Sequence, residues 1–264
     1  MSSIDGSFYT KHLNREDEIV LGRRIVDICN RAMRSYEIQE TDFLDPRGVE
    51  VAISIINRFD EVSYSIQGIF DNAERAIITI YPSYMCEDDI DSRIVLISAI
   101  GNFKFFRASH RDVLGSLLNL GIERDKIGDI IVSPEEIQFA VKKELEHFLL
   151  NSFNRIGKLS IKCNEKNFDE KLDKIIKTET LNLNISALRL DSLIAAIANI
   201  NRKKACDLIS AEKVKLNWRI ATKNSADIKE NDQISIRGFG RFKLSSVNGQ
   251  TKKDRFRITV LKYV

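Results

Sequence analysis

The order of strand-like and helix-like segments between Phe103 and Cys163 constrains the fold of this chain more than any other sequence feature. Runs rich in β-branched and aromatic residues predict strands, and stretches with apolar residues at helical spacing predict helices. Strands are expected at residues 103–107, 129–133, 137–141 and 158–163, and helices at residues 109–120 and 142–153. The resulting β-α-β-β-α-β order is that of the ferredoxin-like (RRM-like) fold, which many RNA-binding modules share with unrelated proteins.

The chain is long enough for further domains on either side of this segment, since its 264 residues exceed one typical domain. Apolar residues recur at helical spacing from Ile19 to Met33, and Asp45-Pro46 predicts the start of a second helix. Further strand-like runs lie at residues 64–66, 76–81 and 93–99. We therefore expect an α+β protein with a mainly helical N-terminal domain at residues 1–71, a ferredoxin-like middle domain at 72–164, a polar linker at 165–184 and a C-terminal domain at 185–264.

The composition argues against several classes of protein. The longest apolar runs, such as residues 94–100, are far shorter than the ~20 residues of a membrane span. The first residues lack the basic start and apolar stretch of a secretory signal. No two cysteines have the spacing of a zinc site; they stand at Cys29, Cys86, Cys163 and Cys206. We expect a cytoplasmic monomer without membrane contact, metal or cofactor.

Charge is distributed unevenly along the chain. From Arg189 to Val264 the sequence has 17 lysines and arginines but 7 aspartates and glutamates, whereas the whole chain has a net charge of +3. The remainder is therefore acidic, with a net charge of −7. A basic end on an acidic chain is typical of a protein that binds a polyanion. The plainer alternative is a basic surface that serves solubility.

Three adjacent cations follow a predicted helix cap within this basic region. Asn201 is a good N-cap, and Arg202, Lys203 and Lys204 stand directly after it. A helix N-terminus carries a partial positive charge, so a cation there typically costs about 0.3–1 kcal/mol at a protein surface. Because the backbone N–H groups at such an end favour an anion, the arrangement predicts a phosphate site. A merely solvated turn is the alternative.

A second basic group follows a strand predicted at residues 234–237. If the chain stays extended, one face carries Arg237, Phe239, Arg241 and Lys243. Arginines on such a face can bind phosphates, and the phenylalanine can stack on a base. The two intervening glycines allow another outcome, a bulge that turns Phe239 into the core. A hairpin turn is predicted further on, at residues 248–249.

The basic region resembles the RNA-binding domain first known from the small-subunit ribosomal protein S-four, also called the alpha-L type. The residues that carry the resemblance are Arg189-Leu190-Asp191, Arg202, Ala205, Leu208-Ile209, Val214 and Asn217. Two positions depart from the usual pattern. Asn201 stands where serine or threonine is usual, and Glu212 stands where glycine is usual.

The chain as a whole resembles the bacterial YlmH family. The resemblance rests on residues 110–115, 120–122, 128–131 and 237–242, which read His-Arg-Asp-Val-Leu-Gly, Leu-Gly-Ile, Gly-Asp-Ile-Ile and Arg-Gly-Phe-Gly-Arg-Phe. It implies a helical N-terminal part, a ferredoxin-like middle RNA-binding domain and an S-four-type domain. It also implies association with the large ribosomal subunit and obstructed peptidyl-tRNA, in quality control of stalled translation.

We therefore expect a non-catalytic protein that binds ribosomal RNA, with tRNA as a further candidate partner. The expected RNA-binding residues are Arg189, Arg202, Lys203, Lys204, Lys213, Arg237, Phe239, Arg241 and Lys243. Asp191 is expected to orient Arg189 or to cap a helix. Replacing Arg202 and Arg241 by glutamate is expected to abolish binding without unfolding the protein.

Two other functions stay open at this point. An RNA-modifying enzyme is one, because domains that resemble the S-four type are appended to pseudouridine synthases, methyltransferases and tyrosyl-tRNA synthetases. The residues that suggest a catalytic site are 110–112 (His-Arg-Asp), which are similar to a kinase catalytic loop. The partner motifs of such a loop are missing, however, and Ser109 with Asp112 fits a capping box. The other is an interaction protein, for instance in cell division, that uses its basic end on a membrane or a protein. No amphipathic helix with aromatic anchors supports that use.

Overall fold

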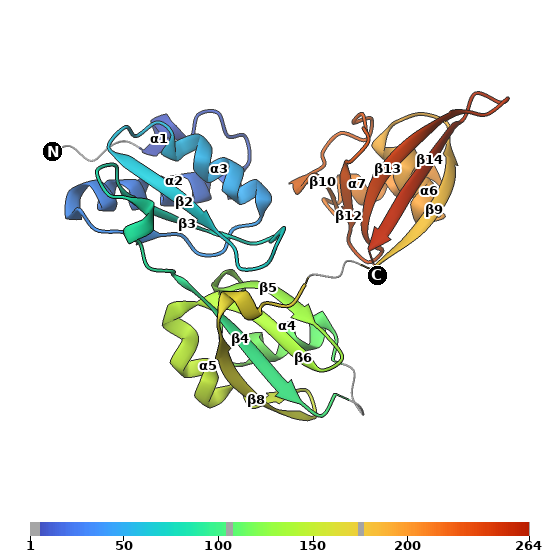
Figure 1. Cartoon of the computed structure of the whole chain (residues 1–264). Helices are drawn as coiled ribbons and strands as arrows, with labels where there is room; N and C mark the ends of the chain where they lie inside the picture. The colour runs from blue at the N-terminus through green and yellow to red at the C-terminus, as the bar shows by residue number, and fades with distance from the viewer. Residues whose placement is uncertain (1–5, 104–107, 174–176, 264) are drawn as a thin grey trace. The chain divides into compact units, whose positions relative to one another are not determined.

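The computed structural model describes residues 6–103, 108–173 and 177–263 (Figure 1). The chain divides into two compact units, residues 1–174 and residues 175–264. Apart from Phe103, the strand predicted at residues 103–107 lies outside the described residues.

The N-terminal part of the first unit packs three helices against a small sheet. The helices are α1 (Gly6–Tyr9), α2 (Glu16–Ser35) and α3 (Pro46–Ile56). The sheet has the order β1-β3-β2 and consists of β1 (Gln39–Glu40), β2 (Val62–Gln67) and β3 (Ile77–Pro82). The predicted start of α3 is confirmed, because the Asp45 side chain accepts a hydrogen bond of 2.8 Å from the backbone N of Gly48.

The strand expected at residues 76–81 belongs to this N-terminal sheet and not to the middle domain. β3 pairs antiparallel with β2 along its full length, from Val62 opposite Pro82 to Gln67 opposite Ile77. All six residues of β3 are buried. Composition identifies a strand but not its partner, so assigning this strand to the middle segment was wrong.

The middle part of the first unit has the predicted ferredoxin-like order. Its elements are β4 (Ile94–Gly101), α4 (His110–Asn119), β5 (Ile127–Val132), β6 (Glu136–Lys142), α5 (Glu146–Ser152), β7 (Arg155–Ile156) and β8 (Leu159–Lys166). The antiparallel sheet has the order β5-β6-β4-β8-β7. Single 3-10 turns lie at Glu87–Asp89, Arg124–Lys126, Lys143–Leu145 and Phe168–Glu170. The first strand of the motif is β4, so its expected placement at residues 103–107 was wrong.

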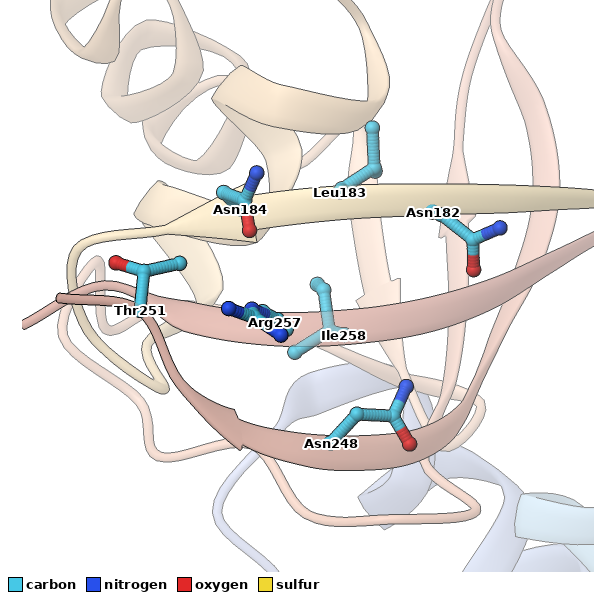
Figure 2. Close-up of a pocket in the computed structure, with 7 residues that line it drawn as sticks. All are labelled: Asn182, Leu183, Asn184, Asn248, Thr251, Arg257 and Ile258. Atoms are coloured by element: carbon cyan, nitrogen blue, oxygen red, sulfur yellow. The ribbon is translucent and has the colours of Figure 1, made fainter.

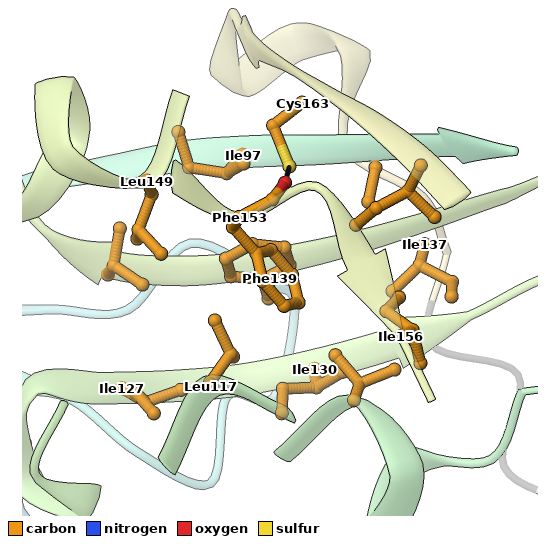
Figure 3. Packing of buried hydrophobic residues seen from close by; sticks show 14 of the residues in the cluster. Ile97, Leu117, Ile127, Ile130, Ile137, Phe139, Leu149, Phe153, Ile156 and Cys163 are labelled. Atoms are coloured by element: carbon orange, nitrogen blue, oxygen red, sulfur yellow. Dashed lines mark hydrogen bonds between the residues drawn. The ribbon is translucent and has the colours of Figure 1, made fainter. Parts of the chain in front are cut away.

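Helices α4 and α5 cover one face of this sheet and enclose the middle core (Figure 3). The rings of Phe139 and Phe153 meet edge to face, with 5.7 Å between their centroids. The Cys163 thiol donates a hydrogen bond of 3.2 Å to the carbonyl oxygen of Phe153. Burial raises the pKa of Cys163 to about 12, so this thiol is a packed core group rather than a reactive one.

The opposite face of the middle sheet is also covered. Phe43, Ile69 and Phe70 of the N-terminal part pack with Leu96 and Ala140 of the sheet. The first unit is therefore held together by an apolar layer between its two parts.

An ion network at the edge of this layer ties the two parts more specifically. Asp42 is 5% exposed and lies 2.9 Å from the Lys126 ammonium and 3.3 Å from that of Lys142. Arg24 forms a further ion pair with the same carboxylate, and Lys142 also pairs with Glu40 at 2.7 Å. Burial raises the pKa of Asp42, but the hydrogen bond from Lys126 and the nearby cations outweigh it, so the pKa is lowered overall.

The second unit is a six-stranded antiparallel sheet with helices on one face. The strands are β9 (Thr178–Ile185), β10 (Val214–Leu216), β11 (Arg219–Ile220), β12 (Gln233–Ile236), β13 (Gly240–Gln250) and β14 (Phe256–Tyr263), in the order β11-β10-β12-β13-β14-β9. Helices α6 (Leu190–Ile197) and α7 (Arg202–Ser210) contribute Leu193 and Ile209 to the core. From the sheet, Phe242 and Val260 pack in the same core.

Both ends of the expected linker at residues 165–184 are sheet. β8 continues to Lys166, and β9 pairs with β14 from Thr178 opposite Tyr263 to Ile185 opposite Phe256. The outward residues of β9 are polar, which explains why composition indicated a linker. Similarly, the predicted turn at residues 248–249 is wrong: β13 continues to Gln250 and the hairpin turns within residues 251–255.

Replacement of Asp42 by asparagine is expected to lower the free energy of unfolding of the first unit by about 1.5–3 kcal/mol at pH 7, because charged hydrogen bonds to Lys126 and Lys142 are lost. Because the pKa of Asp42 is lower in the folded state, its carboxylate stabilises the fold at pH values above its ordinary pKa of 3.8. This stabilisation is lost as the pH falls through the folded-state pKa. The wild-type advantage should therefore disappear in acid. Urea unfolding followed by far-UV circular dichroism measures it.

The exposed Asp17, which pairs with Arg15, provides the control for this change, and its replacement by asparagine should shift stability by less than about 0.5 kcal/mol. Equal effects of the two substitutions would contradict a stabilising role for the buried network.

Candidate nucleic-acid interface

A buried carboxylate lies between the starts of α6 and α7. Arg189 is the N-cap residue of α6, and Arg202 is the first residue of α7. Both guanidinium groups pair with Asp191, at 3.0 Å and 2.9 Å, and its side chain is 3% exposed. The other carboxylate oxygen accepts a hydrogen bond of 2.8 Å from the backbone N of Ser192. Burial raises the pKa of Asp191, but the hydrogen bonds from Arg202 and Arg189 outweigh it and the pKa is lowered overall.

This arrangement confirms that Asp191 orients Arg189, and it corrects the expectation for Arg202. The three cations after Asn201 predict a phosphate site, because cations at a helix N-terminus are unfavourable without an anion. Arg202 has such an anion within the chain, since Asp191 holds it in place while the Arg202 side chain remains 51% exposed. Eleven sequence positions separate the two residues, so no local pattern indicates the pair.

Lys203 and Lys204 fit the sequence-based expectation better. Both side chains are exposed, and neither pairs with an acid in the part of the chain that the structure describes. The predicted cap is confirmed, since the Asn201 side chain accepts a hydrogen bond of 2.8 Å from the backbone N of Lys204. Two ammonium groups therefore extend into solvent at a helix end whose dipole disfavours them. We call Arg189, Arg202, Lys203 and Lys204 the helix-start cluster.

The expected extended face around Phe239 does not form. Gly238 and Gly240 have φ angles of +90° and +113°, and the backbone N of Phe239 donates a 3.0 Å hydrogen bond to Ile236. A tight turn between β12 and β13 therefore carries Arg237 and Phe239. Phe239 is 40% exposed, so the alternative of a core position is wrong as well.

Arg241 and Lys243 do share a face, the one opposite the helices. Their neighbours along β13, Phe242 and Leu244, are buried in the core, so the two cations point outward. The Arg241 guanidinium lies over the Trp218 ring in the turn between β10 and β11, 5.0 Å from its centroid, and 5.8 Å from that of Tyr263 on β14. These aromatic rings restrict the guanidinium group.

The sequence-predicted residues therefore form two clusters. Lys213 lies beside the β12–β13 turn, because its carbonyl oxygen accepts a 2.8 Å hydrogen bond from the backbone N of Arg237. Helix α7 separates this position from the helix-start cluster by its own length, about 13 Å. We call the second group, Lys213, Arg237, Phe239, Arg241 and Lys243, the turn-and-strand cluster.

The turn after α7 contains one of the two departures from the S-four pattern. Glu212, which stands where the S-four pattern usually has glycine, has a φ angle of 54°. Left-handed backbone is easy for glycine and strained for other residues. The chain therefore keeps the turn geometry despite the substitution.

The middle sheet lacks the open face on which RRM-like modules stack bases. Besides the apolar cover described above, Gln138 is 1% exposed and its side chain accepts a 2.7 Å hydrogen bond from the backbone N of Leu172. Its amide nitrogen donates to the carbonyl oxygen of Glu170 at 3.0 Å. The chain after β8 thus lies across this face.

A small basic edge remains exposed on the middle domain. Arg155, Lys158 and Lys162 lie on β7, β8 and the turn between them, and all three are exposed. The sequence does not indicate this group by its charge, because the middle segment is nearly neutral as a whole. The alternation of the three cations with apolar residues such as Ile156 and Ile161 is the signal that could have indicated it.

Among the described residues, no helix is both long and apolar enough to span a membrane. Within the same residues, histidine, cysteine and carboxylate side chains do not gather into a group that could hold a metal ion.

Known proteins resemble this chain over most of its length. Residues 88–170 match the family model "Putative RNA-binding domain in YlmH", and residues 18–85 match "YlmH, N-terminal". The ribosome-associated protein quality control protein P2 of Bacillus subtilis is 30% identical over 245 residues, which cover 93% of this chain and 95% of that protein. A solved structure of the cell division protein ylmH from Streptococcus pneumoniae has a TM-score of 0.52 and 25% identity, and covers 61% of this chain and 97% of that one.

Replacement of Asp191 by asparagine is expected to lower the free energy of unfolding of the second unit by about 1.5–3 kcal/mol, since two charged hydrogen bonds are lost. Trp218 is the single tryptophan of the chain and lies in this unit, so its fluorescence during urea unfolding reports the change. Asp207, exposed on α7, is the matched control. Unchanged unfolding of the Asp191 variant would show that the carboxylate does not anchor the two helices.

Proposed function

The chain belongs to the YlmH family, and we propose that it is a non-catalytic RNA-binding protein of ribosome-associated quality control. Its ligand in this proposal is ribosomal RNA of the large subunit, with peptidyl-tRNA as a second contact of the same complex. The name of the Bacillus subtilis relative and the RNA-binding family model support the general role. We further propose that the protein acts in the cytoplasm as a monomer.

The observation that carries this proposal is the exposed pair Lys203 and Lys204 at the start of α7. An isolated folded chain would be more stable with acids at these positions. A phosphate bound there would neutralise the lysines and accept hydrogen bonds from the helix end. The unit that contains this helix also has the large excess of cations found in the sequence, as expected for a polyanion-binding surface.

The two arginines of the same cluster suit phosphate binding for a different reason. Asp191 fixes one edge of each guanidinium group, so that Arg189 and Arg202 lose little further conformational entropy when their exposed atoms bind an anion. In our proposal the second unit is an S-four-type domain whose helix-start cluster binds the RNA backbone. The turn-and-strand cluster would contact RNA on another side, with Phe239 available for stacking.

An enzymatic alternative has no support from the residues that suggested it. Ser109 and Asp112 form a capping box at the start of α4: the Ser109 hydroxyl donates a 2.7 Å hydrogen bond to Asp112, which also accepts one of 2.9 Å from the Ser109 backbone N. The His-Arg-Asp stretch is therefore explained by helix capping. The interaction protein of cell division remains as an alternative because of the description of the Streptococcus pneumoniae relative.

Exchange of both Lys203 and Lys204 for glutamate is expected to change stability and binding in opposite directions. The helix dipole favours the acids, so the free energy of unfolding should rise by about 1 kcal/mol. Affinity for large ribosomal subunits should fall at least about tenfold, and the slope of log K against log salt should decrease by about 2. Sedimentation with purified subunits and urea unfolding measure the two effects.

The matched control exchanges Lys223 and Lys229, exposed lysines of the same unit, for glutamate. Equal loss of binding in both variants would mean that net charge alone attracts RNA. Full binding by the Lys203 and Lys204 variant would rule out the helix-start cluster. The exchange of Arg202 for glutamate is less informative than expected from sequence, because it places a second carboxylate beside that of buried Asp191.

A further inference from the structure

An open groove lies on the outward face of the C-terminal sheet, away from the core side that the helices cover (Figure 2). Its volume is about 460 Å³, and it is lined by Asn182, Leu183, Asn184, Asn248, Thr251, Arg257 and Ile258. Sites for small ligands usually have volumes of about 300–1,000 Å³, so this groove is large enough for a ligand the size of a single nucleotide. None of the lining residues belongs to the two clusters described above.

The groove results from irregular pairing between β13 and β14. Val247 lies opposite Ile258 and Gln250 opposite Phe256, so β13 has one more residue than its partner over this stretch. A second extra residue lies between Leu244 and Ser246. Such bulges bend a strand and increase its twist, which hollows the face in front of β9 and β14.

Three asparagine side chains reach this hollow from β9 and β13 (Figure 2). Asn182 and Asn184 point away from the core because Leu183 and Ile185, on alternate positions of β9, pack into it. Asn248 comes from the bulged end of β13.

A chain of hydrogen bonds fixes two of these amides. Asn248 donates from its amide nitrogen to the Thr259 hydroxyl at 2.8 Å, and this hydroxyl donates to the Asn182 oxygen at 3.2 Å. The Ser246 hydroxyl donates to the Asn248 oxygen at 3.1 Å. Because the Asn182 oxygen faces Thr259, the Asn182 amide nitrogen points the other way and can donate to a ligand. Fixed amides that can donate and accept are the groups that recognise the edges of nucleobases.

Positive charge adjoins the amides on one side. Arg257 lines the groove and lies opposite Asn184 in the β9–β14 pairing. The hairpin tip beyond it carries Lys252, Lys253 and Arg255, all exposed. A ligand with an uncharged, hydrogen-bonding part and an anionic part would therefore place the first at the amides and the second at Arg257.

We propose that this groove binds one unpaired nucleotide of the RNA, with its base at Asn182, Asn184 and Asn248 and its phosphate at Arg257. The inference rests on the proposed RNA-binding function and assigns it an additional contact site. An acidic peptide fits less well, because Arg257 is the single cation among the lining residues and the three amides carry no charge.

The test uses the full-length protein and two kinds of RNA hairpin, a fully paired one and one with a single unpaired nucleotide in the stem. The bulged hairpin is made in four versions, one for each base at the unpaired position. Dissociation constants are measured by fluorescence anisotropy. Wild-type protein should bind at least one bulged hairpin about tenfold more tightly than the paired one. Replacing Asn182 and Asn184 by alanine should remove this preference and leave binding of the paired hairpin unchanged.

A single Arg257→Ala exchange should lower the salt slope for the bulged RNA by about 1, as expected for loss of one phosphate contact. The control Lys223→Ala removes an exposed cation outside the groove and should preserve the bulge preference. Trp218 fluorescence confirms that each variant is folded.

The outcomes separate this proposal from the function on which it rests. If wild-type protein binds both hairpins equally, or if the asparagine variant keeps the preference, the groove proposal is wrong and RNA binding by the helix-start cluster stands. If wild-type protein binds neither hairpin at low salt, the proposed function itself fails. Displacement of bulged RNA by a polyglutamate peptide in wild type but not in Arg257→Ala would identify the groove as a peptide site and overturn the proposal.

Discussion

The arrangement of the C-terminal unit depends on the buried carboxylate of Asp191. This group joins the starts of two helices, because Arg189 precedes α6 and Arg202 begins α7. A buried carboxylate is unfavourable unless cations and hydrogen-bond donors surround it, and here two guanidinium groups and the Ser192 backbone N do so. One interaction thereby stabilises the helix pair and holds two arginines at the surface in fixed positions.

The two units use their ionisable groups differently. In the first unit, cations such as Lys142 neutralise buried acids and connect the N-terminal and middle parts. In the second unit, Lys203 and Lys204 have no acidic partner among the described residues and remain exposed. The ferredoxin-like sheet is also partly covered by apolar residues such as Phe43 and Phe70. For these reasons we propose that the second unit makes the main RNA contacts, and that any contact by the middle domain, which matches the RNA-binding family model, is made by its exposed edge around Lys162.

Local signals in the sequence predicted local structure well. Asp45, Ser109 and Asn201 start helices as expected, because a cap needs only a side chain and the next few backbone N–H groups. The β-α-β-β-α-β order also followed from apolar periodicity, although the choice of its first strand did not. A strand-like run has the same composition whichever sheet it joins, so composition does not indicate the sheet to which β3 belongs. The polar outward residues of β9 predict a linker although the segment pairs with β14.

Features that depend on distant residues could not be predicted. The partner of Arg202 is a residue of the preceding helix, so the charge of Arg202 looked unbalanced in sequence. Gly238 and Gly240 have positive φ angles, so Arg237 and Phe239 lie in a turn and not in a strand. Strand β13 pairs with β14 as far as Gln250 despite its bulges, so the hairpin turn comes after residues 248–249. The groove lined by Asn182 and Arg257 depends on the bulges of β13 and on the pairing of β14 with β9, a segment more than 70 residues away, so no local pattern indicates it.

We propose that the C-terminal unit makes the main contacts with ribosomal RNA. Ultraviolet crosslinking of the full-length protein to large ribosomal subunits, followed by mass spectrometry of the RNA-linked peptides, tests this proposal. We expect crosslinks in peptides that contain residues 202–204 and 237–243. Crosslinks confined to peptides of residues 1–174, with none in the second unit, would contradict it.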